Sequence, residues 1–180
     1  LAEDAAAQDE VQVAAGGVRQ REDDAGRLAV GAEKRTRQTA LRLFWIAGQL
    51  ADGTSTWCVG PRTLSDLTIP ALRQAAADAG RPDPRVIAAF PVCVTDEVDA
   101  ARKRAATVFA VYDTLPSYKT MMDREGVEGP ADLAIVGDEA DVRDQLAELA
   151  SIGVTDLNAG LYTANAEERA RTRAVLREFV

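Results

Sequence analysis

Histidine is absent from the 180 residues of this chain. Its absence excludes zinc sites built on imidazole ligands, Ser-His-Asp triads and Cys-His dyads. Any acid–base chemistry therefore falls to carboxylates, tyrosine, lysine, cysteine or a cofactor.

Cysteine is scarce, and long apolar runs are missing. The two cysteines, Cys58 and Cys93, form no CxxC pair and lie within apolar, strand-like runs, so we expect buried, reduced thiols. No stretch is long and apolar enough to span a bilayer, and no signal peptide is evident. We therefore expect a cytoplasmic protein with no membrane partner.

The charge balance is acidic, with a formal net charge of −8 and no long run of lysine or arginine. This balance argues against nucleic acid as the main partner, because phosphate binding needs clustered basic side chains. It identifies no substrate by itself. Aromatic residues make up only 5% of the chain, but 47% of it is apolar, which is enough for a globular domain with one core.

Residues 1–39 differ from the rest of the chain. They contain no aromatic residue and no isoleucine, and their few leucines and valines follow no helical or strand period. We expect disorder or weak helix there, because such a segment can bury little apolar area. An interaction tail and the product of a shifted reading frame are the alternatives. We assign residues 1–39 to an atypical N-terminal segment and residues 40–180 to the folded domain.

From residue 39 on, helical and strand patterns alternate. The segment TALRLFWIAGQL predicts a helix with an apolar face, formed by Leu41, Phe44, Trp45, Ala47 and Leu50. Strand-like runs cover residues 54–59, 85–95 and 154–161. Helical patterns cover residues 64–79, 97–112, 115–126, 138–152 and the C-terminus, and residues 129–137 are interpreted as a connector. Pro70 is expected to break its helix or to begin a new one, and Pro91 to cost a ladder hydrogen bond or mark a bulge.

This alternation predicts a parallel α/β fold, in which ligands bind at the carboxyl ends of the strands. The end of the first strand carries the candidate binding residues Trp57, Cys58, Gly60, Pro61 and Arg62. The tryptophan could stack on a planar ring, and the arginine could bind an anion. Composition alone favours the alternative of a core tryptophan and a surface arginine.

The last strand and the acidic residues are less informative. Asn158 and Tyr162 lie at the end of the last strand. Each could be a ligand-binding residue or a purely structural one. Asp138 and Glu139 are interpreted as helix-capping residues rather than a phosphate site, because acidic side chains suit a helix N-terminus and repel phosphate. The acidic group at residues 96–99 is likewise interpreted as capping rather than as a metal site.

Longer motifs resemble a known family. The segments LRLFWIAGQLADGTSTWCVGPRTL, GRPDPRV and GPADLAIVGDE are similar to luciferase-like monooxygenases, and within them to the deazaflavin-dependent oxidoreductases that use coenzyme F420. The similarity extends over about residues 41–163. It implies a (β/α)8 TIM barrel with a cofactor, coenzyme F420 or alternatively FMN, at the carboxyl rim of the strands. It also implies hydride transfer between the reduced deazaflavin and a small organic substrate.

Only three barrel strands can be placed, so the chain resembles the C-terminal part of such a barrel alone. The similarity assigns a rim contribution to the five candidate residues at positions 57, 58 and 60–62, and leaves the catalytic residues unknown. A truncated oxidoreductase is the first hypothesis. A non-catalytic barrel fragment is the second, which self-associates as a homo-oligomer or pairs with a complementary half. A small open α/β binding domain is a third, which requires further strands.

Overall fold

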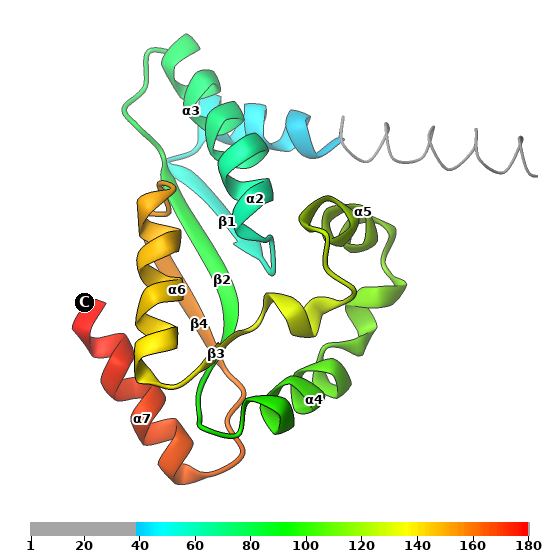
Figure 1. Cartoon of the computed structure of the whole chain (residues 1–180). Coiled ribbons are helices and arrows are strands. Elements are labelled where there is room, and N and C mark those ends of the chain that lie inside the picture. Colours follow the sequence, from blue (N-terminus) through cyan, green and yellow to red (C-terminus); the bar gives the residue numbers. More distant parts are fainter. Residues whose placement is uncertain (1–38, 180) are drawn as a thin grey trace, which may run out of the picture. The chain divides into compact units, whose positions relative to one another are not determined.

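Four parallel strands form the sheet of the computed structural model, which describes residues 39–179 (Figure 1). The central strand, β2 (Arg85–Val94), pairs with the other three: β1 (Gly53–Trp57), β3 (Ile135–Gly137) and β4 (Asp156–Leu161). The parallel α/β architecture predicted from the sequence is therefore confirmed. The expectations for residues 1–38 lie outside the described residues.

Helices connect the strands. A helix over residues 39–50 precedes β1, and the bounds of the others are α2 Pro61–Thr63, α3 Ile69–Asp78, α4 Val98–Val108, α5 Pro116–Glu125, α6 Glu139–Ser151 and α7 Ala166–Leu176. Short turns of helix lie between or after them, at η1 Leu64–Thr68, η2 Ala110–Thr114, η3 Pro130–Leu133 and η4 Arg177–Phe179. No helix of the described part is long and apolar enough to cross a membrane.

Strand β2 is buried on both faces. Its even-numbered side chains, Val86 to Val94, pack against α3, α6 and α7, through residues such as Leu72, Leu146 and Val175. Its odd-numbered face turns the other way, where Cys93 packs against alanines of α4. Figure 1 shows α6 and α7 on one side of the sheet and α4 and α5 on the other. Burying each valine or phenylalanine of this kind contributes about 1.5–3 kcal/mol, so β2 anchors both layers.

Pro91 causes no bulge in β2, contrary to the expectation from the sequence. The odd-numbered backbone groups of β2 face one edge: Ala89 accepts a hydrogen bond there from Cys58, and Thr95 donates one to Gly137. Strand β1 ends before Pro91, and β3 begins to pair only at Val92. The proline therefore lies in the gap between two partner strands, where its missing N–H leaves no ladder bond unmade.

Pro70 lies in the first turn of a new helical segment, α3, which was one of the two outcomes expected from the sequence, and the chain stays helical across it. Elements α2, η1 and α3 run on without interruption from Pro61 to Asp78, and η1 is a π-helical turn. At its end the N–H of Ile69 reaches back five residues to the carbonyl of Leu64. A wider turn directly before a proline makes room for a residue that cannot donate to the preceding turn.

Strand β3 was not expected. It lies within the segment interpreted as a connector, and its three residues are all buried. A run of only three residues, Ile135 to Gly137, is too short to show a strand period.

The first helix was placed correctly by the sequence, and its predicted apolar face is confirmed in part, because Leu41, Phe44 and Ala47 are half-buried and Ala47 packs against the core. Trp45 and Leu50 are 52% and 76% exposed, although both belong to the predicted apolar face. The most buried residue of this helix is Gly48, which lies directly against α3 (cyan helix beside α3 in Figure 1). A Cβ at Gly48 would lie 2.5 Å from the carbonyl oxygen of Leu72 and 2.7 Å from the Cβ of Ala75.

We expect Gly48→Ala to destabilise the fold, although the same substitution in an exposed helix stabilises by about 1 kcal/mol. The added methyl group collides with α3 backbone, which cannot move as a flexible side chain can. Urea denaturation should therefore give a lower midpoint for Gly48→Ala than for the parent chain. Arg42→Ala, on an exposed side of the same helix, is the control and should leave the midpoint nearly unchanged. A stabilised Gly48→Ala variant would contradict the packing of this helix on α3.

Candidate functional site

The side chain of Trp57 lies across the inner face of the sheet, the face turned away from α3, α6 and α7. Trp57 ends β1 and is paired in register with Ala89 of β2. Its indole nevertheless reaches β4, because a Cβ placed on Gly160 would lie 3.2 Å from its Cη2 atom. The small residues Ala89 and Gly160 leave the room that a flat ring needs to lie over three strands.

Aromatic side chains gather around this indole. Phe109 and Tyr112 lie 6.1 and 6.2 Å from Trp57 between ring centroids, Tyr162 lies 5.9 Å from Phe109, and Tyr118 lies 4.7 Å from Tyr112. All three tyrosines of the chain and one of its two tryptophans therefore meet at one place. Such contacts favour edge-on and tilted ring arrangements, which hold the rings in fixed orientations.

A cavity of about 390 Å³ opens beside these rings, at the carboxyl ends of β1 and β4. Its lining residues are Trp57, Arg104, Val108, Phe109, Gly160, Leu161, Tyr162 and Thr163. Three buried polar atoms in this wall lack a hydrogen-bond partner among residues 39–179, namely Trp57 Nε1, Tyr162 Oη and Thr163 Oγ1. A volume of this size suits a small flat molecule, and apolar walls with a few polar groups are typical of ligand sites.

Of the five residues that the sequence singles out, Trp57 alone lines this cavity. Cys58 is fully buried against Met121 and Met122 of α5, and burial raises the pKa of its thiol to about 12. Its backbone adopts a left-handed conformation with φ of 48°, which ends β1 and turns the chain. Both cysteines are buried and free, as the sequence predicts.

Gly60, Pro61 and Arg62 contact α5 rather than the cavity. The carboxylate of Glu125 accepts hydrogen bonds from the N–H groups of Arg62 and Thr63, at the start of the helix formed by α2, η1 and α3. A side chain on Gly60 would collide with Glu125. The guanidinium of Arg62 is largely exposed and donates to the carbonyl of Arg124. The binding role predicted for these residues stays a prediction.

Asn158 and Tyr162, which the sequence left undecided, differ in the structure. Asn158 is exposed, whereas Tyr162 is buried and lines the cavity. The contributions of Arg104 and Phe109 were missed, because both lie on the helical segment after β2 and follow no motif. The scarcity of aromatic residues was the usable signal, since rare aromatic side chains tend to dominate the buried contacts of a site.

The carboxylate of Glu168 links this cavity to the core. It accepts hydrogen bonds from Thr95 Oγ1 at 3.0 Å, from the Ala164 N–H at 2.6 Å and from Arg104 Nη2 at 3.2 Å. Burial acts to raise the pKa of Glu168, but these donors outweigh it and hold the pKa below its ordinary value. The thiol of Cys93 also faces Glu168, and burial together with this carboxylate raises its pKa to about 11.

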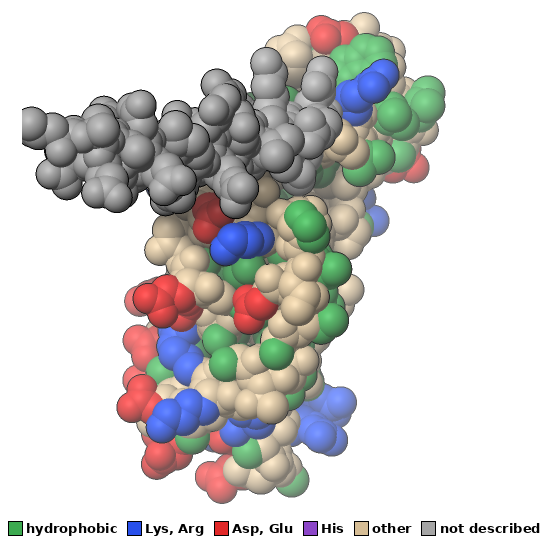
Figure 2. Space-filling model, turned by 90° about the vertical axis from the view of Figure 1, so that its right-hand side faces the viewer, with side chains coloured by type: hydrophobic (Ala, Val, Ile, Leu, Met, Phe, Trp, Pro, Cys, Tyr) green, Lys and Arg blue, Asp and Glu red, His purple; other side chains and the backbone are tan. Residues whose placement is uncertain are grey.

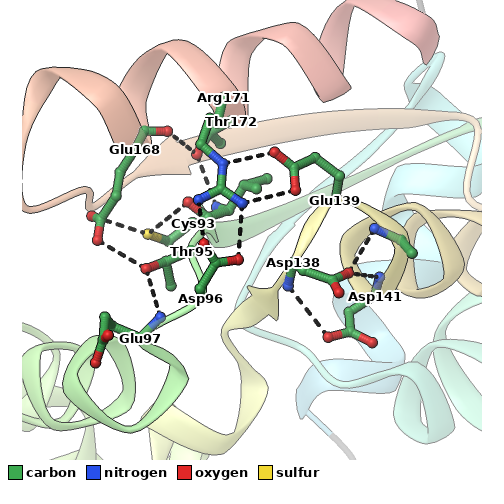
Figure 3. A network of polar contacts seen from close by, with 12 residues as sticks. Cys93, Thr95, Asp96, Glu97, Asp138, Glu139, Asp141, Glu168, Arg171 and Thr172 are labelled. Carbon is green, nitrogen blue, oxygen red and sulfur yellow. Dashed lines mark hydrogen bonds and ion pairs between the residues drawn. The ribbon is translucent and has the colours of Figure 1, made fainter.

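Beside this network, Arg171 of α7 joins the loop after β2 to the start of α6 (Figure 3). Its guanidinium donates to both oxygens of Asp96, at 3.0 Å each, and to both oxygens of Glu139, at 2.7 and 2.8 Å. Asp138 caps α6, as predicted, by accepting from the N–H groups of Ala140 and Asp141. Asp96 does not cap α4; the Thr95 hydroxyl accepts from that helix start instead.

Two further observations concern the charged side chains of the described part. No group of three or more histidine, cysteine, aspartate or glutamate side chains in residues 39–179 could hold a metal ion. On the face shown in Figure 2, acidic and basic side chains lie interspersed. That face therefore carries no continuous basic surface of the kind that binds nucleic acid.

Comparisons with known proteins bear on the fold and its lineage. Residues 41–156, more than half of the chain, match the luciferase-like monooxygenase family. An F420-dependent secondary alcohol dehydrogenase in complex with an F420-acetone adduct matches with 16% identity and a TM-score of 0.57, over 71% of this chain and 42% of that one. No curated protein sequence matches.

A second solved structure extends this likeness. Coenzyme F420 dependent tetrahydromethanopterin reductase from Methanopyrus kandleri matches with 18% identity and a TM-score of 0.62, over 78% of this chain and 49% of that one. The chain thus spans less than half the length of both solved structures. The fold is that of part of a (β/α)8 barrel, as the sequence predicts.

We expect Arg171→Met to reduce the dependence of the free energy of unfolding on pH in the acid range. The hydrogen bonds of Arg171 lower the pKa of Glu139 to about 2 and lower that of Asp96. Because a lowered carboxyl pKa stabilises the fold above the unfolded value of about 4.5, this stabilisation is lost as the pH falls toward 2. Thermal unfolding of the variant should therefore depend less on pH between about 4.5 and 2.

Arg173→Met is the matched control, because Arg173 is an exposed arginine of the same helix. It should keep the acid dependence of the parent chain. Equal acid profiles for Arg171→Met and the parent would show that the two carboxylates do not depend on Arg171.

Proposed function

Because the chain belongs to the luciferase-like monooxygenase family, we propose that it serves hydride transfer between a reduced deazaflavin, coenzyme F420, and a small organic substrate. The observation that carries this proposal is the aromatic-walled cavity at the carboxyl ends of β1 and β4. Ligands of parallel α/β folds bind at that end of the strands. The names of both solved relatives support F420 over FMN, which remains the alternative cofactor.

The residues of the cavity fit a flat heterocyclic ring. The indole of Trp57 is held on the sheet by the close approach of Gly160 and by the ring of Phe109. An immobile aromatic surface of this kind can stack on a planar ligand at a low cost in side-chain entropy. The unpartnered Nε1 of Trp57 and hydroxyl of Thr163 are groups to which ring oxygens or nitrogens could bind.

The chain's own residues would orient the reactants. When bound, a reduced deazaflavin supplies the hydride. Phe109 and Leu161 give the cavity apolar walls, and Val108, which is exposed, lies at its edge. Proton transfer cannot use an imidazole, because the chain has none. We propose no catalytic residue.

The proposal includes a cytoplasmic location. Buried, unpaired cysteines agree with a reducing compartment. The four strands of the described residues supply one wall of the proposed pocket.

Saturable binding of coenzyme F420 to the purified chain tests the proposal. We expect fluorescence titration to give a dissociation constant that rises at least tenfold in Trp57→Ala and much less in Trp57→Phe, because a phenyl ring retains most of the stacking surface. Trp45→Ala removes the other, exposed tryptophan and is the matched control. A lack of saturable binding at high micromolar concentrations would rule out the proposal for this chain.

A second candidate function is supported by the open sheet. The outer edges of β1 and β4 have no partner strand among residues 39–179. Large apolar side chains are exposed on the helix that precedes β1, namely Leu43, Trp45, Ile46 and Leu50. Unpaired strand edges and exposed apolar groups favour association. The chain would then be a non-catalytic fragment that binds a second copy or a complementary half-barrel.

Light scattering after size-exclusion chromatography tests this second function. We expect a mass above that of the 19.2 kDa monomer at tens of micromolar, and a shift toward monomer in Trp45→Glu/Leu50→Glu, because two buried charges oppose association. Leu115→Glu, an exposed apolar residue far along the chain, serves as control. A compact monomer with sharp thermal unfolding would count against this function.

A further inference from the structure

Arg104 is held rigidly at one end of the cavity. Its Nε donates to the backbone carbonyl of Tyr162 at 2.9 Å, and its Nη2 donates to Glu168 at 3.2 Å. Its guanidinium carbon also lies 5.6 Å from the centre of the Tyr162 ring. Three contacts thus fix both the position and the plane of the guanidinium, so that an incoming ligand meets a pre-oriented group.

The network behind Arg104 is saturated. Glu168 already accepts hydrogen bonds from Thr95, from Ala164 and from the arginine itself. Its oxygens are therefore occupied by donors of the chain, and its role is to hold Arg104. The Nη1 group of Arg104, by contrast, has no partner in the described part of the chain, and the side chain is 26% exposed.

A second, independent feature of the same wall is the hydroxyl of Tyr162. The residue is only 8% exposed, it lines the cavity, and its Oη has no hydrogen-bond partner among residues 39–179. A buried hydroxyl without a partner is costly. Thr163, the next residue, has an unpartnered hydroxyl in the same wall. This end of the cavity therefore combines one free guanidinium edge with two free hydroxyl groups.

The Tyr162 hydroxyl is a hydrogen-bond donor. Burial, and after it Cys93 and Glu168, raise the pKa of Tyr162 above its ordinary value, and Arg102 and Arg104 act against them. The hydroxyl therefore stays protonated, and the positive charge at this end of the cavity is that of the Arg104 guanidinium. The opposite end of the cavity is apolar, because the rings of Trp57 and Phe109 form it, inclined to each other at 63°.

We propose that Arg104 and Tyr162 form a carboxylate subsite, and that the organic substrate is a flat aromatic carboxylate whose ring lies toward Trp57 and Phe109. The inference rests on the proposed function, which it deepens by naming a substrate class. The Nη1 group of Arg104 and the Tyr162 hydroxyl donate to the carboxylate oxygens, in charge-assisted hydrogen bonds that a neutral amide of equal shape cannot match.

Benzoate and benzamide are the matched probes, since they share shape and ring and differ in charge. We expect isothermal titration of the full chain without cofactor to show benzoate binding at least tenfold more tightly than benzamide. The preference should vanish in Arg104→Met and fall severalfold in Tyr162→Phe. Lys103→Met removes the same charge from an exposed neighbour on α4 and should keep the full preference.

Arg104→Met leaves Glu168 without its ion pair, so the double variant Arg104→Met/Glu168→Gln is measured in parallel. It removes both charges together and should also lose the preference while circular dichroism confirms a folded chain. Equal affinity for the two probes in the parent chain, no binding of benzoate, or an unchanged preference in the folded double variant would each overturn the subsite.

The outcome is separable from that of the cofactor proposal. Binding of F420 without a benzoate preference would leave the hydride-transfer proposal standing and remove the substrate class. A benzoate preference without F420 binding would keep the carboxylate subsite and remove the proposed hydride transfer.

Discussion

The burial of β2 on both faces is the constraint on which the rest of the structure depends. One face needs the helices α3, α6 and α7, and the other needs α4 and the aromatic side chains that follow it. A strand covered on both sides must be apolar throughout, and residues 85–94 are nearly so. The strands that line the cavity, β1 and β4, pair with β2, and the helix α4 follows β2 in the chain.

The cavity depends on the absence of large side chains at one position each of β2 and β4. Ala89 and Gly160 are small, and only small residues let an indole from β1 lie flat over the sheet. The rings of Phe109 and Tyr112 then pack against Trp57, because α4 returns the chain over the same face. The wall of the site therefore follows from side-chain size in the sheet as much as from the aromatic residues themselves.

The sequence predicted the order of the elements and three of the strands, because period and caps are local properties. It did not predict that Pro91 would lie between two partner strands, since that depends on where β1 ends and β3 begins. It singled out Trp57 from its place at a strand end, but not Arg104, whose position depends on contacts with residues about 60 positions later. The solvent exposure of Trp45 was missed for the same reason. A helical period shows which side chains share a face, but not which other elements cover that face.

Glu125 has a consequence for any ligand that approaches the end of β1. Its carboxylate occupies the N–H groups of Arg62 and Thr63, which begin a helix of three joined segments. Such helix starts are ready anion sites. A phosphate or acid arriving there competes with an anion tethered to the same chain, whose effective concentration is of the order of millimolar for a flexible tether and higher for a folded one. The start of this helix is thus already occupied by a carboxylate of the same chain. Only a ligand that binds more tightly than Glu125 can replace it.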